Sequence, residues 1–310
     1  MVRLDGGPFL MGTDYPKGYP EDGEGPVRQV TLDPFWIDAT SVTNAAFADF
    51  IEDTGYTTEA ERFGWSFVFH LHVPRKYQEK LRRDASVPQT PWWLAVPGAR
   101  WDRPYGERSS IRDVMDHPVV QVSWNDAAAY ARWAGKRLAT EAEWEYAARG
   151  GREQTIFPWG DQLEPRGKHR CNVWQGKFPV ENNAADGFVG TCPVTAFTPN
   201  GYGLSNLCGN VWEWTNDWFS ATWHTEESEA TRVNPIGPVP PPPPPPGRGD
   251  AKPQAASALP GAASFSHKVQ KGGSYLCHAS YCNRYRLGAR TANTPDSATT
   301  NNGFRCVRDV

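Results

Sequence analysis

Glycine and proline restrict what this chain can fold into. The sequence has 29 glycines and 28 prolines among 310 residues, and both residue types interrupt regular helices and strands. It also has 14 tryptophans, and each tryptophan can bury a large apolar surface. The segment TPWWLAVPGARW, at 90–101, is expected to lie in the core for this reason. We therefore predict a compact fold with modest helix and strand content, in which aromatic packing holds long ordered loops.

The length and the charges exclude several classes of protein. A chain of 310 residues is long enough for one large domain or two ordinary ones. The net charge is −3 and the signs are mixed, so neither nucleic acid nor an anionic membrane is an expected partner. The mean hydropathy is −0.62, and no apolar run is long enough to span a membrane. The N-terminal residues lack a signal-peptide pattern, so we expect a cytoplasmic protein with reduced thiols.

Three segments have the sequence pattern of capped helices. Segments 43–55, 123–135 and 140–151 each begin with a serine or threonine that can cap a helix, and each ends at a glycine. The runs at 27–38 and 117–124 predict short strands, of which the second is expected to be buried.

A proline-rich segment interrupts the C-terminal third of the chain. Residues 235–262 include seven consecutive prolines, and this composition favours a polyproline II or disordered insert over a packed core. The strand-like run VQKGGSYLC follows the insert. We therefore predict one domain over residues 1–310 that carries this insert as a loop.

Two of the six cysteines, Cys277 and Cys282, lie close together in the segment GGSYLCHASYCNRYR. Structural zinc and iron–sulfur clusters prefer four ligands, and the other cysteines are scattered. Two thiolates alone suit Cu(I), since soft sulfur ligands favour this ion. The same pair can also form a disulfide or exchange with a substrate thiol. Spacing alone therefore leaves a metal site, a redox pair, a disulfide and two unrelated thiols open.

The neighbours of the two cysteines favour a functional role. Ser274 and Tyr281 can hydrogen-bond a bound sulfur or oxygen species. Three nearby arginines add positive charge, which lowers the pKa of a thiol, although we favour pairing with buried carboxylates for at least two of them. These arginines are Arg284, Arg286 and Arg290. No G-x-S-x-G, P-loop or H-E-x-x-H motif is present.

Two loops are rich in oxygen ligands. Segments 171–188 and 205–218 carry Asn, Asp and Glu side chains among tight turns. Calcium prefers about six to eight oxygen ligands, and several of these are often backbone carbonyls. Neither loop is an EF-hand. Asx turns around an aromatic core would place the same residue types here, so composition leaves both interpretations open.

Seven segments of the chain match the pattern of a known family: GGPFLMGTD, TGYTTEAERFGWSFVF, HPVVQVSWNDAAAYARWAGKRLATEAEWEYAARGG, NGYGLSNLCGNVWEWTNDW, GGSYLCHASYCNRYR, NTPDS and GFRC. Together they resemble the formylglycine-generating enzyme family, also called sulfatase-modifying factors, in its bacterial type. The resemblance covers essentially the whole chain apart from the insert. The two cysteines of CHASYC are its specific part, because non-catalytic relatives lack them. It implies an α+β fold, namely a variant of the C-type lectin-like fold with little regular secondary structure.

The resemblance implies a copper-dependent oxidoreductase. Family members use O₂ and copper to oxidise one cysteine in a sulfatase segment of pattern C-x-P-x-R to Cα-formylglycine. Carried over to this chain, Cys277 and Cys282 would bind Cu(I), and the substrate thiolate would add as a third ligand. A copper–oxygen species would then take a hydrogen from the substrate Cβ. Ser274 and Tyr281 match family positions near the reacting sulfur and oxygen, so these four residues form the implied catalytic set.

The resemblance also implies a substrate and the residues that bind it. Trp212 matches an aromatic residue that lines the pocket, and Arg290 and Asn301 match positions in the groove that receives the substrate. The implied partner is an unfolded or extended sulfatase polypeptide that bears C-x-P-x-R. We expect the protein to be a monomer.

The resemblance further implies that both oxygen-rich loops bind Ca²⁺. In each loop, side-chain oxygens and backbone carbonyls together would supply the ligands. The first set is Asn172, Val173 (backbone), Asp186 and Phe188 (backbone), and the second set is Asn206, Gly209 (backbone), Val211 (backbone) and Glu213.

The chain departs from the family pattern at Cys306. Secreted members pair a cysteine at this position, but the expected partner positions are Ala148 and Leu287, so we predict a free buried thiol. The main alternative function is a non-catalytic, lectin-like binding module on the same scaffold. An iron-dependent sulfoxide synthase is a further alternative, but its H-x-x-x-H-x-E motif is absent.

Overall fold

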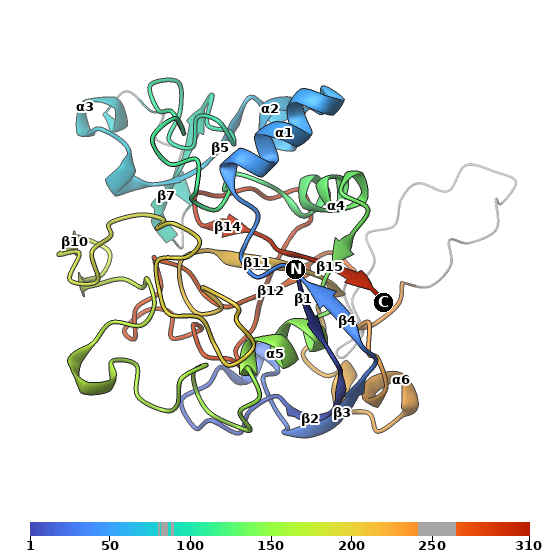
Figure 1. The fold of residues 1–310 in the computed structure, drawn as a ribbon. Helices are drawn as coiled ribbons and strands as arrows, with labels where there is room; N and C mark the ends of the chain where they lie inside the picture. Colours follow the sequence, from blue (N-terminus) through green and yellow to red (C-terminus); the bar gives the residue numbers. More distant parts are fainter. Residues whose placement is uncertain (80, 82–85, 88–89, 241–264) are drawn as a thin grey trace, which may run out of the picture.

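The computed structural model describes residues 1–79, 81, 86–87, 90–240 and 265–310. Short helices and strands are joined by long ordered loops (Figure 1), as the glycine and proline content predicts. From residue 241 onward, the predicted proline-rich insert lies outside the described residues. None of the helices in the described ranges is both long enough and apolar enough to cross a membrane.

The three predicted helices are confirmed. In α1 (Asn44–Thr54), the Thr43 hydroxyl accepts a hydrogen bond from the backbone of the first turn. The helices α4 (Trp124–Trp133) and α5 (Glu141–Arg149) each begin with a complete capping box, in which side chain and backbone satisfy each other's free donors. The shorter helices are α2 (Glu59–Phe63), α3 (Arg75–Gln78) and α6 (Glu229–Arg232).

A four-stranded sheet lies at the centre of the molecule, with strand order β13-β12-β11-β14. The strands β11 (Trp212–Trp218) and β12 (Lys268–Lys271) are antiparallel. Strand β13 (Thr291–Asn293) extends the sheet beside β12, and β14 (Asn302–Gly303) runs parallel to β11. The predicted strand after the proline-rich segment is therefore confirmed as β12. It leads directly into the loop that carries the cysteine pair.

The second four-stranded sheet has the order β1-β4-β15-β8. It contains β1 (Val2–Leu4), β4 (Phe35–Ile37), β15 (Cys306–Asp309) and β8 (Arg137–Leu138). Strands β1 and β15 pair with the two edges of β4, so both chain ends lie in this sheet with β4 between them (Figure 1).

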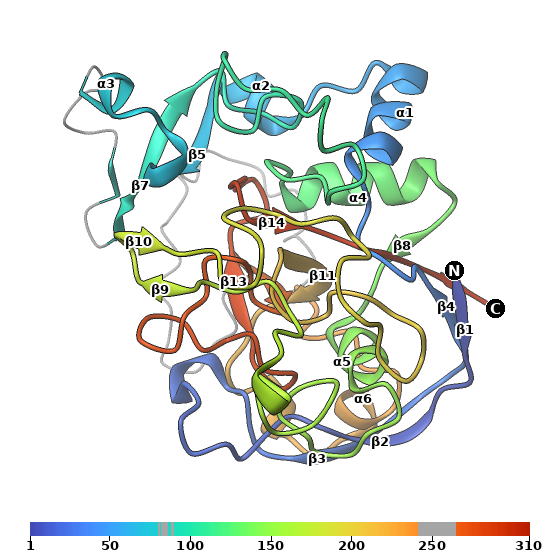
Figure 2. The ribbon, with the colours of Figure 1, turned by 60° about the vertical axis from the view of Figure 1, so that its left-hand side comes forward.

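Three smaller sheets complete the described strands. They are β2 (Gly7–Met11) with β3 (Arg28–Leu32), β9 (Gly176–Lys177) with β10 (Glu181–Asn182), and β5 (Trp65–Phe69) with β7 (Thr90–Pro97) and β6 (Ser86–Val87). Strands β3 and β4 confirm the strands predicted within 27–38. In Figure 2, the β5–β7 ribbon and the β9–β10 hairpin lie on the same side of the molecule as β13. This grouping forms the surroundings of the cysteine loop.

The predicted buried strand at 117–124 is wrong as a strand, although the segment is buried. Only Pro118 forms a bridge, to Thr43. Its neighbours bond to loops instead: the Val119 amide donates to the Val42 carbonyl, and the Gln121 amide donates to the Thr299 carbonyl. Proline has no amide hydrogen for a ladder, and Gln121 has a φ of 60°, which no strand residue adopts. The apolar pattern therefore predicted burial correctly and hydrogen bonding incorrectly.

Candidate functional site

Two glycines position the cysteine loop against the core. Gly272 and Gly273 follow β12 with φ of 90° and 71°. A Cβ on Gly273 would lie 2.8 Å from the Tyr285 Cα, and one on Gly272 would lie 3.0 Å from the Trp144 ring. Side chains at these positions would therefore clash with the core as well as strain the backbone. The close approach leaves the following Ser274 fully buried.

The two cysteine side chains meet inside this loop. The Tyr281 and Cys282 amides both donate to the His278 carbonyl, at 2.9 and 2.7 Å, so the chain turns back on itself. The turn brings the Cys282 Sγ to 2.8 Å from the Cys277 Sγ. Both cysteines are free and buried.

The two thiols differ in their affinity for a proton. Burial raises the pKa of the Cys277 thiol well above its ordinary value, and the contact with Cys282 raises it further. The hydrogen bond with Cys277 lowers the pKa of the Cys282 thiol, and the charge of Arg284 acts in the same direction. Of the two thiols, Cys282 is therefore the one that loses its proton more readily.

A chain of hydrogen bonds holds Ser274 beside the thiols. The Thr299 hydroxyl donates to the Asn301 Oδ1 at 2.6 Å, and the Asn301 amide donates to the Ser274 Oγ at 2.9 Å. The first bond sets the orientation of the Asn301 amide. Since the Ser274 oxygen accepts from Asn301, its own hydrogen is free to bond to the Cys277 sulfur, an interaction that lowers the pKa of Cys277.

A cavity of about 230 Å³ opens onto the cysteine pair. Six of the predicted catalytic and substrate-binding residues line it: Cys277, Cys282, Ser274, Tyr281, Trp212 and Asn301. These residues come from the cysteine loop, from β11 and from the segment before β14. The structure therefore brings together all but one of the residues predicted for the catalytic and substrate sites.

Sequence reasoning missed the aromatic wall of the cavity. Trp92, Trp93 and Phe178 line it, and the Phe178 ring stacks on Tyr281 with centroids 4.4 Å apart. The segment 90–101 was expected in the core, but Trp92 and Trp93 are only half-buried. A tryptophan pair carries no mark that separates a core position from a cavity wall, so no sequence signal identified this role.

Arg290 does not line the cysteine cavity, and its place in a substrate groove stays a prediction. Its side chain is buried, and its guanidinium lies 2.8 Å from the Glu141 carboxylate and donates to the Ser220 carbonyl at 2.8 Å. A buried cation needs such a partner. Arg290 therefore stabilises the interior at a distance from the thiols.

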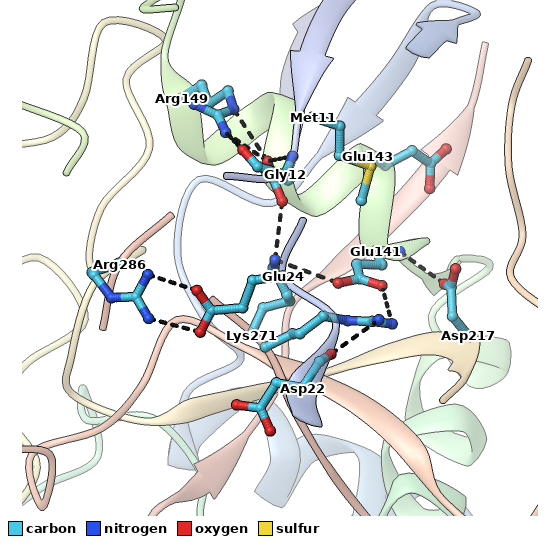
Figure 3. A network of polar contacts seen from close by, with 12 residues as sticks. Met11, Gly12, Asp22, Glu24, Glu141, Glu143, Arg149, Asp217, Lys271 and Arg286 are labelled. Carbon is cyan, nitrogen blue, oxygen red and sulfur yellow. Dashed lines mark hydrogen bonds and ion pairs between the residues drawn. The ribbon is translucent and has the colours of Figure 1, made fainter. Parts of the chain in front are cut away.

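The other two arginines are also paired with carboxylates. Arg284 bonds to Asp22, and Arg286 forms two bonds of 2.7 Å to Glu24. Figure 3 shows Arg286 and Glu24 face to face. This outcome confirms the alternative explanation of the arginines.

A buried lysine anchors the strand that leads to the cysteine loop. The Lys271 Nζ lies 3.0 Å from a Glu145 carboxylate oxygen and 3.4 Å from one of Glu141. Figure 3 shows Lys271 and Glu141 within one polar network. Lys271 and Lys268 mark the two ends of β12, so this network holds the end of the strand from which Gly272 and Gly273 depart.

The first predicted calcium set is brought together in the structure. The Asp186 carboxylate accepts from the backbone amides of Val173 and Phe188, both at 3.1 Å. The Asn172 Oδ1 is buried and has no hydrogen-bond partner among the described residues. A buried oxygen without a partner is costly, and a bound cation would satisfy it. These residues therefore fit calcium, with amide and carbonyl oxygens supplementing one carboxylate.

The second predicted calcium set fits only in part. The Asn206 Oδ1 is also buried without a partner in the described part of the chain. The Glu213 carboxylate, however, accepts from Ser41, Trp144 and both ends of the Arg305 guanidinium, at 2.7 to 2.8 Å. Four donors occupy its lone pairs and Arg305 neutralises its charge. Glu213 as a calcium ligand therefore stays a prediction, and in this structure its carboxylate is already paired with Arg305.

Both oxygen-rich loops contact the cysteine loop through the backbone. The Gly209 amide donates to the Gly272 carbonyl, and the Trp174 amide donates to the Cys277 carbonyl. The Tyr275 amide in turn donates to the Asn210 carbonyl. A cation in these loops would therefore support the loop that holds the thiols without touching them.

The remaining cysteines lie outside the cavity. Cys306 is free and fully buried, which confirms the prediction of an unpaired thiol. Burial raises the pKa of Cys306 above its ordinary range, so this thiol stays protonated and inert.

The sequence model of the family described as "Sulfatase-modifying factor enzyme 1-like domain" matches residues 1–310. The chain belongs to this family. A curated relative of Thermomonospora curvata, "Formylglycine-generating enzyme", is 57% identical over 309 residues, with 100% of this chain and 93% of the relative covered. A relative of the same name from Streptomyces coelicolor is 54% identical, with 100% and 89% covered.

The sulfatase-modifying factor family also includes a relative whose name denotes inactivity. "Inactive C-alpha-formylglycine-generating enzyme 2" of Mus musculus is 44% identical to this chain, with 99% of this chain and 85% of the relative covered.

The solved structure of PvdO from Pseudomonas aeruginosa has a similar fold. Its TM-score is 0.64 at 23% identity, and the alignment covers 100% of this chain and 94% of PvdO. The fold is α+β with few helices, and it is a variant of the C-type lectin-like fold. The predicted fold class is confirmed.

Proposed function

We propose that the protein oxidises the cysteine of a C-x-P-x-R segment in a sulfatase polypeptide to Cα-formylglycine. O₂ is the oxidant, and Cys277 and Cys282 hold Cu(I). One observation carries this proposal: in a chain of the sulfatase-modifying factor family, two free thiols lie 2.8 Å apart on the wall of a cavity of about 230 Å³. The names of the similar relatives support formylglycine as the product, and the description of the family supports a sulfatase substrate.

The donor set suits the proposed metal. Two adjacent sulfur ligands on one side leave other positions open, and soft thiolates favour Cu(I) over harder ions. Bound Cu(I) would supply the activation of O₂ that lets a hydrogen leave the substrate Cβ. The lowered pKa of Cys282 supports this role, because the thiolate is the form of cysteine that binds metals.

The remaining residues would orient the substrate and exclude water. Ser274, held by Asn301, can donate its hydroxyl hydrogen toward sulfur. Tyr281 is fixed by stacking on Phe178 and by the edge of Trp92, 4.9 Å away. Trp212 also lines the cavity. Rigid aromatic walls would hold the substrate cysteine in one place, which is how positioned groups raise rates.

The overall conversion needs an external reductant. The change from CH₂–SH to an aldehyde releases H₂S and removes two electrons from the substrate. Reduction of O₂ to water takes four electrons, and one of its oxygen atoms can enter the aldehyde through water. The remaining two electrons must come from a thiol reductant, which an added dithiol supplies in an assay.

We also propose that calcium binds the first oxygen-rich loop. The buried Asn172 Oδ1 without a partner supports this site. The role would be structural, because the Trp174 amide beside this loop bonds to the Cys277 carbonyl.

A direct experiment tests the reaction. The Cu(I)-loaded protein is incubated with a C-x-P-x-R peptide, O₂ and a dithiol, and mass spectrometry follows loss of the peptide thiol and gain of a hydrazide-reactive aldehyde. Cys277→Ala and Cys282→Ala should abolish turnover, whereas Cys306→Ala, which removes a buried thiol outside the cavity, should retain it. Full turnover in either cavity variant would refute the copper assignment. Peptide binding without conversion in the loaded protein would instead favour the non-catalytic module.

A further inference from the structure

A second hollow lies beside the cysteine cavity, on the β5 side of the molecule. Its volume is about 270 Å³. One wall consists of Phe63, Trp65 and Phe67, and the other consists of residues within 294–298. We call this hollow the aromatic trough. The Trp65 ring lies 5.0 Å from Phe67 and 6.5 Å from Phe63, so the three rings form one continuous apolar surface.

The aromatic trough is open to solvent. Phe63 is 51% exposed and Trp65 is 38% exposed. Soluble proteins rarely leave a contiguous aromatic surface uncovered unless it binds something. The exposed rings therefore indicate a binding surface.

One face of the β5–β7 ribbon connects the trough to the cysteine cavity. Alternation along β5 places Trp65, Phe67 and Phe69 on one face. Their cross-strand partners are Pro97, Ala95 and Trp93, and residues directly opposite each other share a face. Trp93 lines the cysteine cavity and Trp65 lines the trough. The two hollows therefore lie at the two ends of a single ribbon face.

The opposite wall is also shared. Residues 291–293 and Thr299 line the cysteine cavity, whereas Thr294 and residues 296–298 line the trough. The Ser66 hydroxyl donates to the Ala298 carbonyl at 2.8 Å, and Thr299 bridges to Phe67. These bonds hold the segment against β5 at the point where one hollow gives way to the other.

We propose that the aromatic trough is a docking site for a second part of the substrate polypeptide whose cysteine lies in the cysteine cavity. This inference rests on the proposed function. Trp93 and Pro97 are four residues apart, which spans about 13 Å in an extended chain. An extended substrate would therefore place an apolar side chain in the trough about four residues from the part that lies against Trp93.

The chemistry of the trough selects an unfolded substrate. An unfolded polypeptide exposes apolar side chains that a folded sulfatase would bury, so such a side chain is available to the trough only before folding. Asp296 is exposed at the rim. Its negative charge disfavours an acidic substrate residue at this position.

Extended peptides test the docking site. A core C-x-P-x-R peptide is compared with two sets of longer peptides, one extended on the N-terminal side and one on the C-terminal side. Each extended peptide carries Phe, Ser or Glu at the fourth residue beyond the core. For one of the two directions of extension, the Phe peptide should have a KM about 3- to 10-fold lower than that of the Ser peptide, with kcat unchanged. The KM of the Glu peptide should not be lower than that of the Ser peptide. An equal KM for Phe and Ser peptides on both sides would overturn the proposal.

Surface variants assign the effect to the trough. Phe63→Ser and Trp65→Ser should each remove the advantage of the Phe peptide and leave the kinetics of the core peptide unchanged. Leu71→Ser is the matched control, because Leu71 is 47% exposed and lines neither hollow. Retention of the Phe advantage in both trough variants would overturn the proposal.

Failure of the proposed function gives a different result. If the core peptide is not converted by the Cu(I)-loaded protein, the proposed reaction is wrong. Fluorescence anisotropy of labelled peptides then still tests docking, and tighter binding of the Phe peptide that depends on Trp65 supports the trough. Equal binding of Phe and Ser peptides refutes it.

Discussion

The Cys277 and Cys282 sulfurs share a hydrogen bond across 2.8 Å, and this bond lowers the pKa of Cys282. The two positions are five residues apart, and a single tight turn at His278 brings them together. Burial disfavours a charge on either sulfur, but the shared proton stabilises the charge on Cys282. The loop thus makes Cys282 the more acidic of the two thiols at the cavity wall.

This asymmetry predicts selective alkylation. In the metal-free protein at neutral pH, iodoacetamide should modify Cys282 before Cys277, because the thiolate is the reactive form. Cys277→Ala removes the S–H donor and should slow alkylation of Cys282, by about tenfold for each unit by which its pKa rises. Peptide mapping by mass spectrometry gives both rates. Equal rates at the two cysteines of the wild-type protein would contradict the asymmetry.

The bond from Thr299 to Asn301 predicts an effect on turnover. Thr299→Val removes the hydroxyl that orients the Asn301 amide, so Ser274 loses its fixed donor. We expect kcat/KM for a core peptide to fall about 3- to 10-fold, since a hydrogen bond contributes about 0.5–1.5 kcal/mol. Thr299→Ser should restore it. Thr300→Val is the matched control, because the buried Thr300 hydroxyl has no partner among the described residues; an equal loss in both valine variants would argue against the role.

Calcium removal should lower stability. If the first oxygen-rich loop binds calcium, saturation at about 100 times Kd adds about 2.7 kcal/mol to the free energy of unfolding. A chelator should then lower Tm, and Asp186→Asn should abolish this dependence. Glu227→Gln, which changes an exposed carboxylate elsewhere, should retain it. A Tm that does not respond to chelation would count against the site.

The Glu213–Arg305 pair predicts a large loss of stability without a loss of calcium. Both side chains are fully buried. Glu213→Gln leaves the Arg305 charge without its counter-ion, which costs about 3–5 kcal/mol. Denaturant unfolding with and without calcium separates the two roles. The exposed pair of Arg3 and Asp5 serves as a reference, since Arg3→Gln should cost less than about 1 kcal/mol. Loss of the calcium response in Glu213→Gln would instead support Glu213 as a calcium ligand.

Asp217 predicts a pH dependence of stability. Burial, together with the charge of Glu141, raises the pKa of Asp217 from 3.8 to about 8. The folded state therefore keeps a proton that the unfolded state loses, and this carboxyl lowers stability progressively as pH rises from about 4 to about 8. Asp217→Asn removes that titration and can still accept the Glu141 amide bond. The stability of the variant relative to wild type should therefore rise across this window, by a few kcal/mol at most. A difference that is constant between pH 4 and 8 would contradict the raised pKa.

Local patterns predicted the helices well. Ser123 and Thr140 cap helices because their partners, Asp126 and Glu143, lie three residues ahead. Such a bond needs only the local backbone, so sequence spacing reveals it. By contrast, the strand predicted at 117–124 is wrong, because backbone amides of this segment bond to residues as distant as Thr299, which local spacing does not reveal.

The sequence predicted the residues of the cysteine loop at the candidate site but not most of the aromatic residues that line the cavity. The two thiols and Ser274 lie within nine residues of each other, and the family resemblance added Trp212 and Asn301. Trp92 and Phe178 come from segments far away in the sequence. Nothing in their local sequence distinguishes a cavity wall from a core.

By itself, the sequence determined the features that depend on near neighbours: the helix caps and the two thiols within reach of each other. Only the tertiary structure decided which charged groups are free. Arg290 forms an ion pair with Glu141, which lies 149 positions away in the chain. Glu213 forms an ion pair with Arg305, which lies 92 positions away. Burial makes such pairing obligatory, since an unpaired charge in the interior is costly, and burial is a property of the whole fold.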